Sequence, residues 1–283
     1  MAKALTKMNE QTKGIIAIVC ANIIFGMNIP VTKALVSGWV TPMAYTLIRM
    51  FFGAIVFWII GFSGKNEKIQ TKDYFILALG GFLGFLSTQY TFALALQYTT
   101  PVNYALLMAL TPVIVLVLSA FFLKEKIGWK KLLGILLSVS GAILIVAYGK
   151  SGGQGKNDLL GILIALLCSV CYGIYILLTR SVSIKYSPIT VVKWMFLFAL
   201  IFSFPFGING IAEQKIFSSQ IALSGIFLMA FSLIFSTLIA FFFMPVALGR
   251  LKASTVSIFM NLQPVVASII AIIVGQDFLL GIN

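Results

Sequence analysis

Long apolar stretches alternate with short polar segments along the whole of this chain. A helix that crosses a bilayer needs roughly 20 mostly apolar residues, because in hydrocarbon its backbone polar groups must be paired within the helix. Nine runs satisfy this requirement. We therefore expect an all-α, polytopic helical membrane protein, with spans over residues 14–36, 42–62, 74–96, 101–123, 129–148, 159–179, 189–206, 221–247 and 253–274.

The first and sixth of these runs repeat one another. Residues 14–34 align without a gap on residues 161–181 at a constant offset of 147, so that GIIAIVCANIIFGMNIPVTKA faces GILIALLCSVCYGIYILLTRS. The second and seventh runs open alike, with Thr41-Pro42 and Ser187-Pro188, each a hydroxyl N-cap followed by proline at the first helical position.

The fourth and ninth runs also repeat, at an offset of 152 that pairs Pro112 with Pro264 and Glu125 with Asp277. Each repeat then holds five spans, an odd number, so the second repeat enters the membrane from the opposite side. We expect two inverted five-helix repeats at 14–148 and 159–283, with nine spans present and the tenth missing from the end of the chain. Inverted repeats are typical of transporters. The alternative is gene duplication in a structural membrane protein.

Composition and charge agree with this interpretation. Hydrophobic residues make up 60% of the chain and charged residues 10%, with a mean hydropathy of +1.08. The net charge of +13 could indicate nucleic acid, but its distribution indicates topology instead. With the N-terminus in the cytoplasm, fifteen of the 20 Lys and Arg residues fall inside, and four fall outside, namely Lys33, Lys150, Lys156 and Lys215. The positive-inside rule therefore orients the N-terminus in, and we expect no nucleic-acid partner.

The sequence offers no catalytic or metal-binding set. Cys168-x-x-Cys171 has the spacing of a metal or redox motif, but it lies in an apolar run, and the chain contains no histidine. An enzyme working inside the membrane would need a nucleophile and base, or metal ligands, in one place. All seven acidic residues lie at termini, loops or span ends. We therefore expect neither enzyme activity nor a cofactor.

Polar residues recur on one face of the fourth run and of its repeat. Asn103, Leu107 and Thr111 are spaced i, i+4 and i+8, and so share one face of a continuous helix. Their repeat counterparts are Thr255, Phe259 and Gln263. The proline after Thr111 and the proline after Gln263 each remove a backbone hydrogen bond and free a carbonyl that can face a cavity.

The first, third, sixth and eighth runs add further polar and aromatic groups. We expect six spans to line a central cavity, because Asn22, Phe25 and Asn28 match Ser169, Tyr172 and Tyr175, while the third run holds Ser87–Tyr90 and the eighth Ser236–Thr237. The predicted substrate-binding residues are Asn22, Phe25, Asn28, Tyr90, Asn103, Thr111, Tyr172, Tyr175, Thr255 and Gln263. The alternative for each is a hydrogen bond between helices. The fifth run, with Gly134, Ser138 and Gly141, is assigned to the scaffold.

Two cations lie within apolar runs. Arg49 and Lys193 each sit roughly 10 Å into a span by helix rise. Either side chain could snorkel to the interface. A buried cation could also pair with a carboxylate on a substrate; snorkelling or pairing with the backbone is equally favoured for Arg49 and more favoured for Lys193.

Several segments resemble one known family. FGMNIPVTK resembles the first-span signature of the EamA-like family of the drug/metabolite transporter superfamily, and TPMAYTLIR its second span. ALQYTTPVNYALLMALTPV resembles its third-to-fourth junction, and VALGRLKASTVSIFMNLQPVVASIIAIIVGQD the equivalent in the second half. The resemblance covers nearly the whole chain. It implies a ten-helix transporter of two inverted repeats that moves small metabolites, often amino acids or drug-like compounds, across a bacterial inner membrane.

The sequence thus predicts a secondary transporter, an exporter, that works by alternating access. Its partners would be a small-molecule substrate and the lipid bilayer, and a homodimer is left open. A flippase for a lipid-linked sugar is the alternative within the same fold, and an intramembrane enzyme is the less favoured one.

Overall fold

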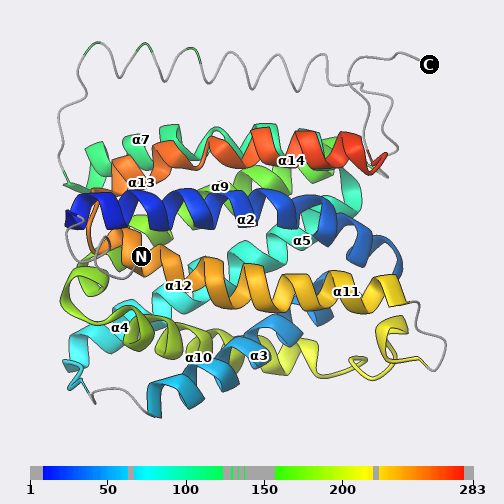
Figure 1. The fold of residues 1–283 in the computed structure, drawn as a ribbon, viewed down its shortest axis with the longest axis horizontal. Coiled ribbons are helices and arrows are strands. Elements are labelled where there is room, and N and C mark those ends of the chain that lie inside the picture. Colours follow the sequence, from blue (N-terminus) through cyan, green and yellow to red (C-terminus); the bar gives the residue numbers. More distant parts are fainter. Residues whose placement is uncertain are drawn as a thin grey trace, which may run out of the picture.

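The computed structural model describes residues 9–62, 67–123, 157–218 and 223–276, together with positions 129, 133 and 137. Within these residues the regular elements are all helices (Figure 1). The first half contains α2 (Glu10–Gly38), α3 (Pro42–Phe62), α4 (Thr71–Gly80), η1 (Gly81–Ser87), α5 (Thr88–Tyr98), α6 (Pro101–Met108) and α7 (Thr111–Leu123). The second half contains α9 (Asp158–Lys185), α10 (Pro188–Gly207), η2 (Lys215–Phe217), α11 (Leu223–Phe231), η3 (Ser232–Ala240), α12 (Phe241–Leu248), α13 (Ala253–Phe259) and α14 (Leu262–Ile273).

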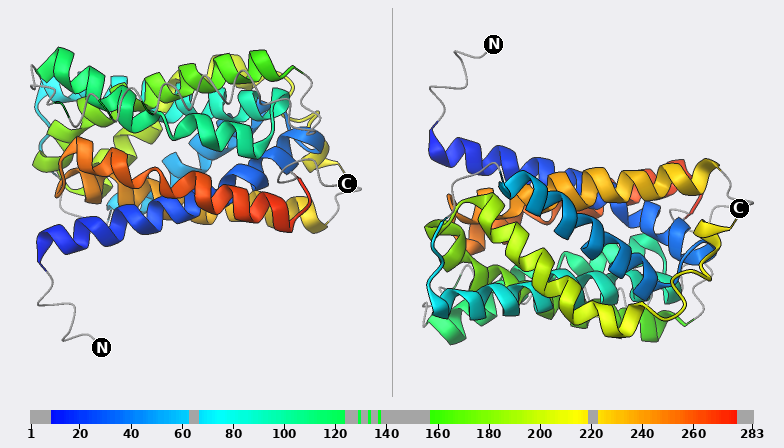
Figure 2. Two further views of the ribbon diagram at one scale, coloured as in Figure 1. Left: turned by 90° about the horizontal axis from the view of Figure 1, so that it is seen from above. Right: turned by 90° about the horizontal axis from the view of Figure 1, so that it is seen from below.

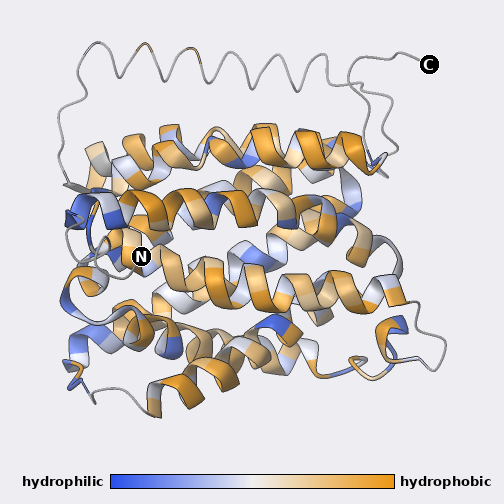
Figure 3. Cartoon of the chain, in the orientation of Figure 1, coloured by the Kyte–Doolittle hydropathy of each residue, from blue (hydrophilic) through white to orange (hydrophobic). Residues whose placement is uncertain are grey.

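Eight helical segments of the described chain are long and apolar enough to cross a bilayer, counting consecutive elements such as α4, η1 and α5 as one. They correspond to eight of the nine predicted spans. The predicted fifth span, 129–148, lies outside the described residues, as do Glu125 and Asp277. Figure 3 shows hydrophobic residues along most of the helix lengths, with hydrophilic residues gathered toward the ends.

The first and sixth spans are longer than their apolar runs. α2 begins at Glu10, where the Asn9 side chain caps the helix, and α9 continues to Lys185. Charged residues at these ends extend a helix beyond the hydrocarbon without cost, because water and headgroups solvate them. The two predicted hydroxyl caps are present: Thr41 Oγ1 accepts from the Ala44 amide at 3.3 Å, and Ser187 Oγ from the Thr190 amide at 3.3 Å.

The packing of the two halves follows matching patterns. α2 packs against α12 and α14, while its repeat counterpart α9 packs against α5 and α7. Figure 2 shows α2 and α14 side by side along their length. α3 and its counterpart α10 pack against each other. Each half therefore places its first span against the later spans of the other half.

Candidate functional site

Two spans are interrupted at equivalent positions. α6 ends at Met108 and α7 begins at Thr111, with a turn at Ala109–Leu110 between them. α13 ends at Phe259 and α14 begins at Leu262, with a turn at Met260–Asn261. Each interruption directly precedes one of the two aligned prolines. Such breaks free backbone groups in mid-membrane, and they are tolerated where the backbone lines a cavity or is buried in protein.

Two other spans each contain a π-helix, η1 in the third span and η3 in the eighth. In both, a threonine hydroxyl bonds to the carbonyl oxygen five residues earlier: Thr88 Oγ1 to Leu83 at 2.6 Å, and Thr237 Oγ1 to Ser232 at 2.8 Å. π-Helices are rare and occur frequently at functional sites. Four of the eight spans are thus irregular in their middle, in two repeat-related pairs.

A cavity of about 40 Å³ lies among these irregular segments. One water needs roughly 10–15 Å³ of such space, so the cavity can hold a few waters and is too small for a metabolite. The protein is therefore closed around its centre. The lining combines amides, hydroxyls and aromatic rings: Phe25, Asn28, Ile29, Thr88, Gln89, Phe92, Tyr104, Met108, Tyr172 and Gln263.

An amide pair joins the first and ninth spans beside this cavity. Gln263 Nε2 donates to Asn22 Oδ1 at 2.6 Å, and Asn22 Nδ2 donates to the Ile18 carbonyl at 2.8 Å. The close approach depends on Gly26, where a Cβ would lie 2.9 Å from the Gln263 carbonyl oxygen. Gln263 is positioned by the break before α14, and so it faces α2 at the cavity wall.

A buried arginine stands at the centre of a second polar network. The Arg49 side chain is 0% exposed. Its Nε donates to Thr237 Oγ1 at 2.7 Å and its Nη2 to Ser236 Oγ at 2.9 Å, both on η3. Its Nη1 donates to Gln89 Oε1 and to the Tyr45 hydroxyl, the latter at 3.4 Å.

Tyr45 connects this arginine to the cavity. Its hydroxyl bonds with Thr32 Oγ1 at 2.8 Å and Ser232 Oγ at 3.1 Å, and accepts from Asn28 Nδ2 at 3.3 Å. Ser232 Oγ in turn donates to Asn28 Oδ1 at 2.8 Å. Asn28 and Gln89 therefore belong both to the cavity wall and to the arginine network.

Matching contacts join the spans at the two ends of the molecule. At one end, Lys33 Nζ donates to the carbonyl oxygens of Leu96 at 2.7 Å and Thr99 at 3.0 Å, and a Cβ at Gly161 would lie 2.7 Å from Thr99 Cβ. At the opposite end, Arg180 Nε donates to the Leu251 carbonyl at 3.3 Å, and a Cβ at Gly14 would lie 2.9 Å from Leu251 Cγ.

These contacts are repeat-related. Lys33 aligns with Arg180, and Gly14 with Gly161, at the offset of 147. The residues that they contact, Thr99 and Leu251, follow the third and eighth spans at an offset of 152. Figure 1 places the α5–α6 junction and the α12–α13 junction at opposite ends of the molecule. The contacts at the two ends are therefore built in the same way.

Charged groups gather at the end that holds the α9–α10 turn. Asp73 Oδ2 pairs with Lys185 Nζ at 2.5 Å and accepts from the Tyr186 hydroxyl at 2.6 Å. Lys193 lies 5.2 Å from the Trp58 ring centroid and near Glu67. Burial acts to raise the pKa of the Glu67 carboxyl, but hydrogen bonds from Thr190 and Ser187 outweigh it, so the net pKa is below its ordinary value.

The structure brings together only part of the predicted site. Phe25, Asn28, Tyr172 and Gln263 line the cavity, and Asn22 binds Gln263. Tyr175 stacks behind Tyr172, with ring centroids 5.4 Å apart.

The other four predicted residues neither line the cavity nor contact its wall in this way: Tyr90, Asn103, Thr111 and Thr255. Tyr90 borders a separate, mostly apolar hollow of about 530 Å³. Thr111 is buried, and its hydroxyl has no hydrogen-bond partner within the described part of the chain. The expectation that Asn103 and Thr111 share one face assumed a continuous helix, and the turn at Ala109–Leu110 interrupts that face.

Sequence reasoning singled out Arg49 but did not place the second span among those that line the cavity, and it missed Tyr45. Tyr45 and Arg49 lie four residues apart on α3, and so share a face directed into the network. This i, i+4 pair in an apolar run was the available signal. Phe92, Tyr104 and Met108 carry no comparable signal, since aromatic and apolar residues occur on every face of these spans.

Broken helices around a closed polar cavity, within a bundle of apolar spans, define a polytopic membrane transporter. The model of the EamA-like transporter family matches the chain twice, over residues 12–147 and 159–280. The chain therefore belongs to the EamA-like transporter family, within the drug/metabolite transporter superfamily, and is a transporter and not an enzyme.

Similar proteins agree with this assignment. The uncharacterized transporter YetK of Bacillus subtilis is 24% identical over 273 residues, which are 95% of this chain and 82% of YetK. A transporter of Archaeoglobus fulgidus is 28% identical over 232 residues, 81% of this chain and 78% of its own length. A crystal structure of another protein matches with a TM-score of 0.63 at 19% identity, covering 92% of this chain and 91% of that one, and so shows the fold.

Proposed function

We propose that this protein exports a small organic molecule by alternating access, between two inverted repeats at 14–148 and 159–283. The substrate would occupy an enlarged form of the central cavity, where Asn28, Gln263 and Tyr172 meet. Amino acids and drug-like compounds are the substrates that the family resemblance favours. We assign the membrane to the bacterial cell inner membrane, with the N-terminus in the cytoplasm.

The observation that carries this proposal is the pair of repeat-related closures. Thr99 is held between Lys33 and Gly161 at one end, and Leu251 between Arg180 and Gly14 at the other. Because the two closures share no residue, one can open while the other stays shut. Alternate opening of two such closures around one site is what alternating access requires.

The charge distribution supports the orientation. Lys13, Lys72, Lys185 and Arg250 belong to the end that holds the α9–α10 turn, whereas Lys215 lies beyond the opposite end of α10. The positive-inside rule then places the α9–α10 turn in the cytoplasm. Reporter fusions within 182–187 and 208–219 test this orientation, and a cytoplasmic 208–219 segment would reverse it.

A lipid-linked sugar flippase receives less support. It would need a lateral opening from the bilayer into the central cavity. The large hollow beside Tyr90 and Phe82 shares no lining residue with that cavity.

Two wedge variants test alternating access. In a background with Cys20, Cys168 and Cys171 changed to Ser, Phe25→Cys reports access to the cavity. Gly161→Leu should wedge open the end at Thr99, so that a small membrane-impermeant thiosulfonate labels position 25 from outside. Gly14→Leu should open the end at Leu251 and permit labelling from the cytoplasmic face.

The control is Gly38→Leu, because a Cβ at Gly38 meets nothing within 4 Å. It should leave labelling as in the background chain. Labelling from the same face in both wedge variants would contradict the proposal. A thermal-shift screen of the purified protein against amino acids, nucleosides and lipid-linked sugars then identifies the substrate class.

A further inference from the structure

The Arg49 guanidinium is the most deeply buried charge in the described part of the chain. The side chain is fully buried in the protein and does not extend to the membrane–water interface, so the snorkelling alternative does not apply. Its bonds are made to side chains of two other elements, α5 through Gln89 and η3 through Ser236 and Thr237, and to Tyr45 on its own helix. All of these acceptors are neutral.

No carboxylate of the described residues pairs with this charge. Glu10 pairs with Lys13 and Arg250, and Asp73 with Lys185. Glu67 accepts from Ser187, and Asp158 from Thr99. A buried cation without a counter-charge is strongly unfavourable in a membrane, and such residues mark substrate or ion pathways. The unbalanced charge therefore points to a negatively charged ligand.

The network leads from the guanidinium to the cavity. Gln89 Oε1 accepts from Arg49 Nη1, and the same side chain lines the cavity. The guanidinium has five N–H groups. Four of them have acceptors here, and the remaining one, on Nη2, has none among the described contacts. Rotation of the Gln89 amide would present Nη1 to the cavity, where an oxygen anion could replace the amide oxygen.

The rest of the cavity wall limits what such an anion can be. Its other lining residues are neutral, and Phe25, Phe92, Tyr104 and Tyr172 give it an aromatic surface. One cation balances one negative charge, and no lining carboxylate is present to bind a cationic group. These features favour an organic monoanion with an apolar or aromatic body.

We propose that Arg49 binds the monoanionic group, such as a carboxylate, of the transported molecule, by exchange with the Gln89 amide oxygen. This proposal rests on the proposed transport function. It makes Arg49 a specificity-determining residue, and Gln89 a neutral occupant of the anion position in the closed, empty state.

The test compares matched ligands on the purified full-length protein in nanodiscs. Phenylacetate and phenylacetamide have nearly the same shape and differ in charge, and sodium chloride supplies a simple inorganic anion. In wild type we expect phenylacetate to stabilise against heat at a concentration at least tenfold lower than phenylacetamide. Equal effects of the two ligands would overturn the proposal.

Variants separate charge recognition from structure. Arg49→Gln should bring the preference for the anion close to onefold, and Arg49→Lys should retain part of it. Lys193→Gln removes another membrane cation outside the cavity, and should keep the wild-type preference. An Arg49→Gln protein that still prefers phenylacetate would refute the assignment, since a purely structural arginine predicts that result.

Gln89→Glu keeps the test decisive even where Arg49→Gln fails to fold. It places an internal carboxylate beside Arg49, so the fold should be retained and the anion preference lost. Retention of the anion preference in Gln89→Glu would contradict the proposal. Loss of the anion preference in Glu125→Gln or Asp277→Asn would also contradict it, because the carboxylates of these residues would then be the partners of Arg49.

The remaining outcomes distinguish the sources of the anion and the two proposals. Arg49-dependent stabilisation by chloride equal to that by phenylacetate would assign the site to an inorganic anion, against our inference. Failure of the wedge variants with an intact, Arg49-dependent anion preference would reject alternating access but leave this binding site. Working wedge variants without any anion preference would reject the binding site alone.

Discussion

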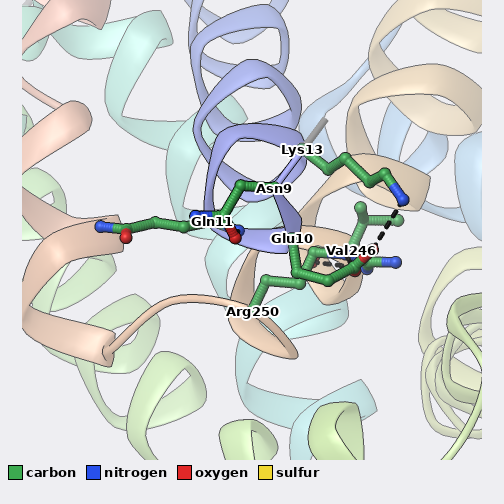
Figure 4. A network of polar contacts seen from close by, with 6 residues as sticks. All are labelled: Asn9, Glu10, Gln11, Lys13, Val246 and Arg250. Atoms are coloured by element: carbon green, nitrogen blue, oxygen red, sulfur yellow. Dashed lines mark hydrogen bonds and ion pairs between the residues drawn. The ribbon is translucent and has the colours of Figure 1, made fainter. Parts of the chain in front are cut away.

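Two arginines of this chain occupy opposite environments. Arg250, at the end of α12, donates through Nε to Glu10 Oε2 at 2.8 Å and through Nη1 to the Val246 carbonyl at 3.1 Å, while Lys13 also pairs with Glu10 (Figure 4). The Glu10 side chain is 63% exposed, so water already solvates this cluster. Arg49 is 0% exposed and has no carboxylate partner among the described residues.

The difference between the two environments is the basis for the role proposed for Arg49. An exposed ion pair typically contributes about 0–1 kcal/mol, because water competes for both partners. A buried charge held by neutral groups keeps most of its potential for a ligand, because no solvent or counter-ion screens it. The paired charges lie at the ends, and the charge that we propose for recognition is Arg49, which has no carboxylate partner among the described residues.

The largest expected effect comes from replacing each arginine in turn. Arg49→Gln should reduce transport per folded molecule at least about tenfold, a change of about 1.4 kcal/mol, since it removes the charge at the cavity. Arg250→Gln should stay within about twofold of wild type, because an exposed pair is worth so little. Uptake into proteoliposomes, corrected for folded protein, measures both. Equal losses in the two variants would erase the distinction between centre and ends.

Packing at the centre should be equally intolerant. A Cβ at Gly84, in η1, would lie 2.2 Å from Tyr175 Cδ2, whereas a Cβ at Gly38, near the end of α2, meets nothing within 4 Å. Gly84→Ala should therefore lose about 1–3 kcal/mol of stability by overpacking. Gly38→Ala should change stability by less than about 1 kcal/mol. Thermal unfolding in detergent compares the two, and a stable Gly84→Ala protein would mean that η1 and α9 can separate freely.

The amide pair tests whether polarity in the cavity serves transport or folding. Gln263→Ala removes the donor to Asn22 Oδ1, but water in the cavity can replace it, so folded yield should stay near wild type. Transport should fall several-fold, which corresponds to a free-energy change of less than about 1.4 kcal/mol. Asn103→Ala, outside the cavity wall, should have the smaller effect on transport. A loss of folded protein with normal transport per molecule would make the pair structural.

The smallest effect should appear at the charged end. The pKa of Glu67 is below its ordinary value, so its carboxylate stabilises the folded state above the unfolded pKa of about 4.3, and this stabilisation is lost as the pH falls through the lower folded pKa. Glu67→Gln should lower the melting temperature slightly at pH 7, because the free energy of unfolding should fall by less than about 1 kcal/mol. The two proteins should converge below about pH 4, and a constant difference down to pH 3 would exclude the charge as the cause.

The sequence by itself determined the features that depend on local chemistry. Span positions follow from the length of apolar runs, and the starts of α3 and α10 from a hydroxyl followed by proline. The alignment of Thr111-Pro112 with Gln263-Pro264 indicated where two spans lose a backbone hydrogen bond, and the two helices break just before these prolines. Asn28 and Gln263 could be assigned to the cavity because an amide in a lipid-length run needs an internal partner.

Only the tertiary structure decided which of two residues adjacent in sequence faces the cavity, and which groups the Arg49 guanidinium contacts. Gln89 lines the cavity and Tyr90 does not. Consecutive residues of a helix point about 100° apart, and the π-helix η1 ends just before them, so a regular period counted from the start of the span does not predict which of the two faces the cavity. For Arg49 the sequence left two alternatives equal: pairing with a substrate carboxylate, and snorkelling or pairing with the backbone. The environment of Arg49 depends on η3 and α5, which enclose α3. The residues that bond to Arg49 lie about 190 positions away on η3 and 40 positions away on α5, and no local pattern encodes such contacts.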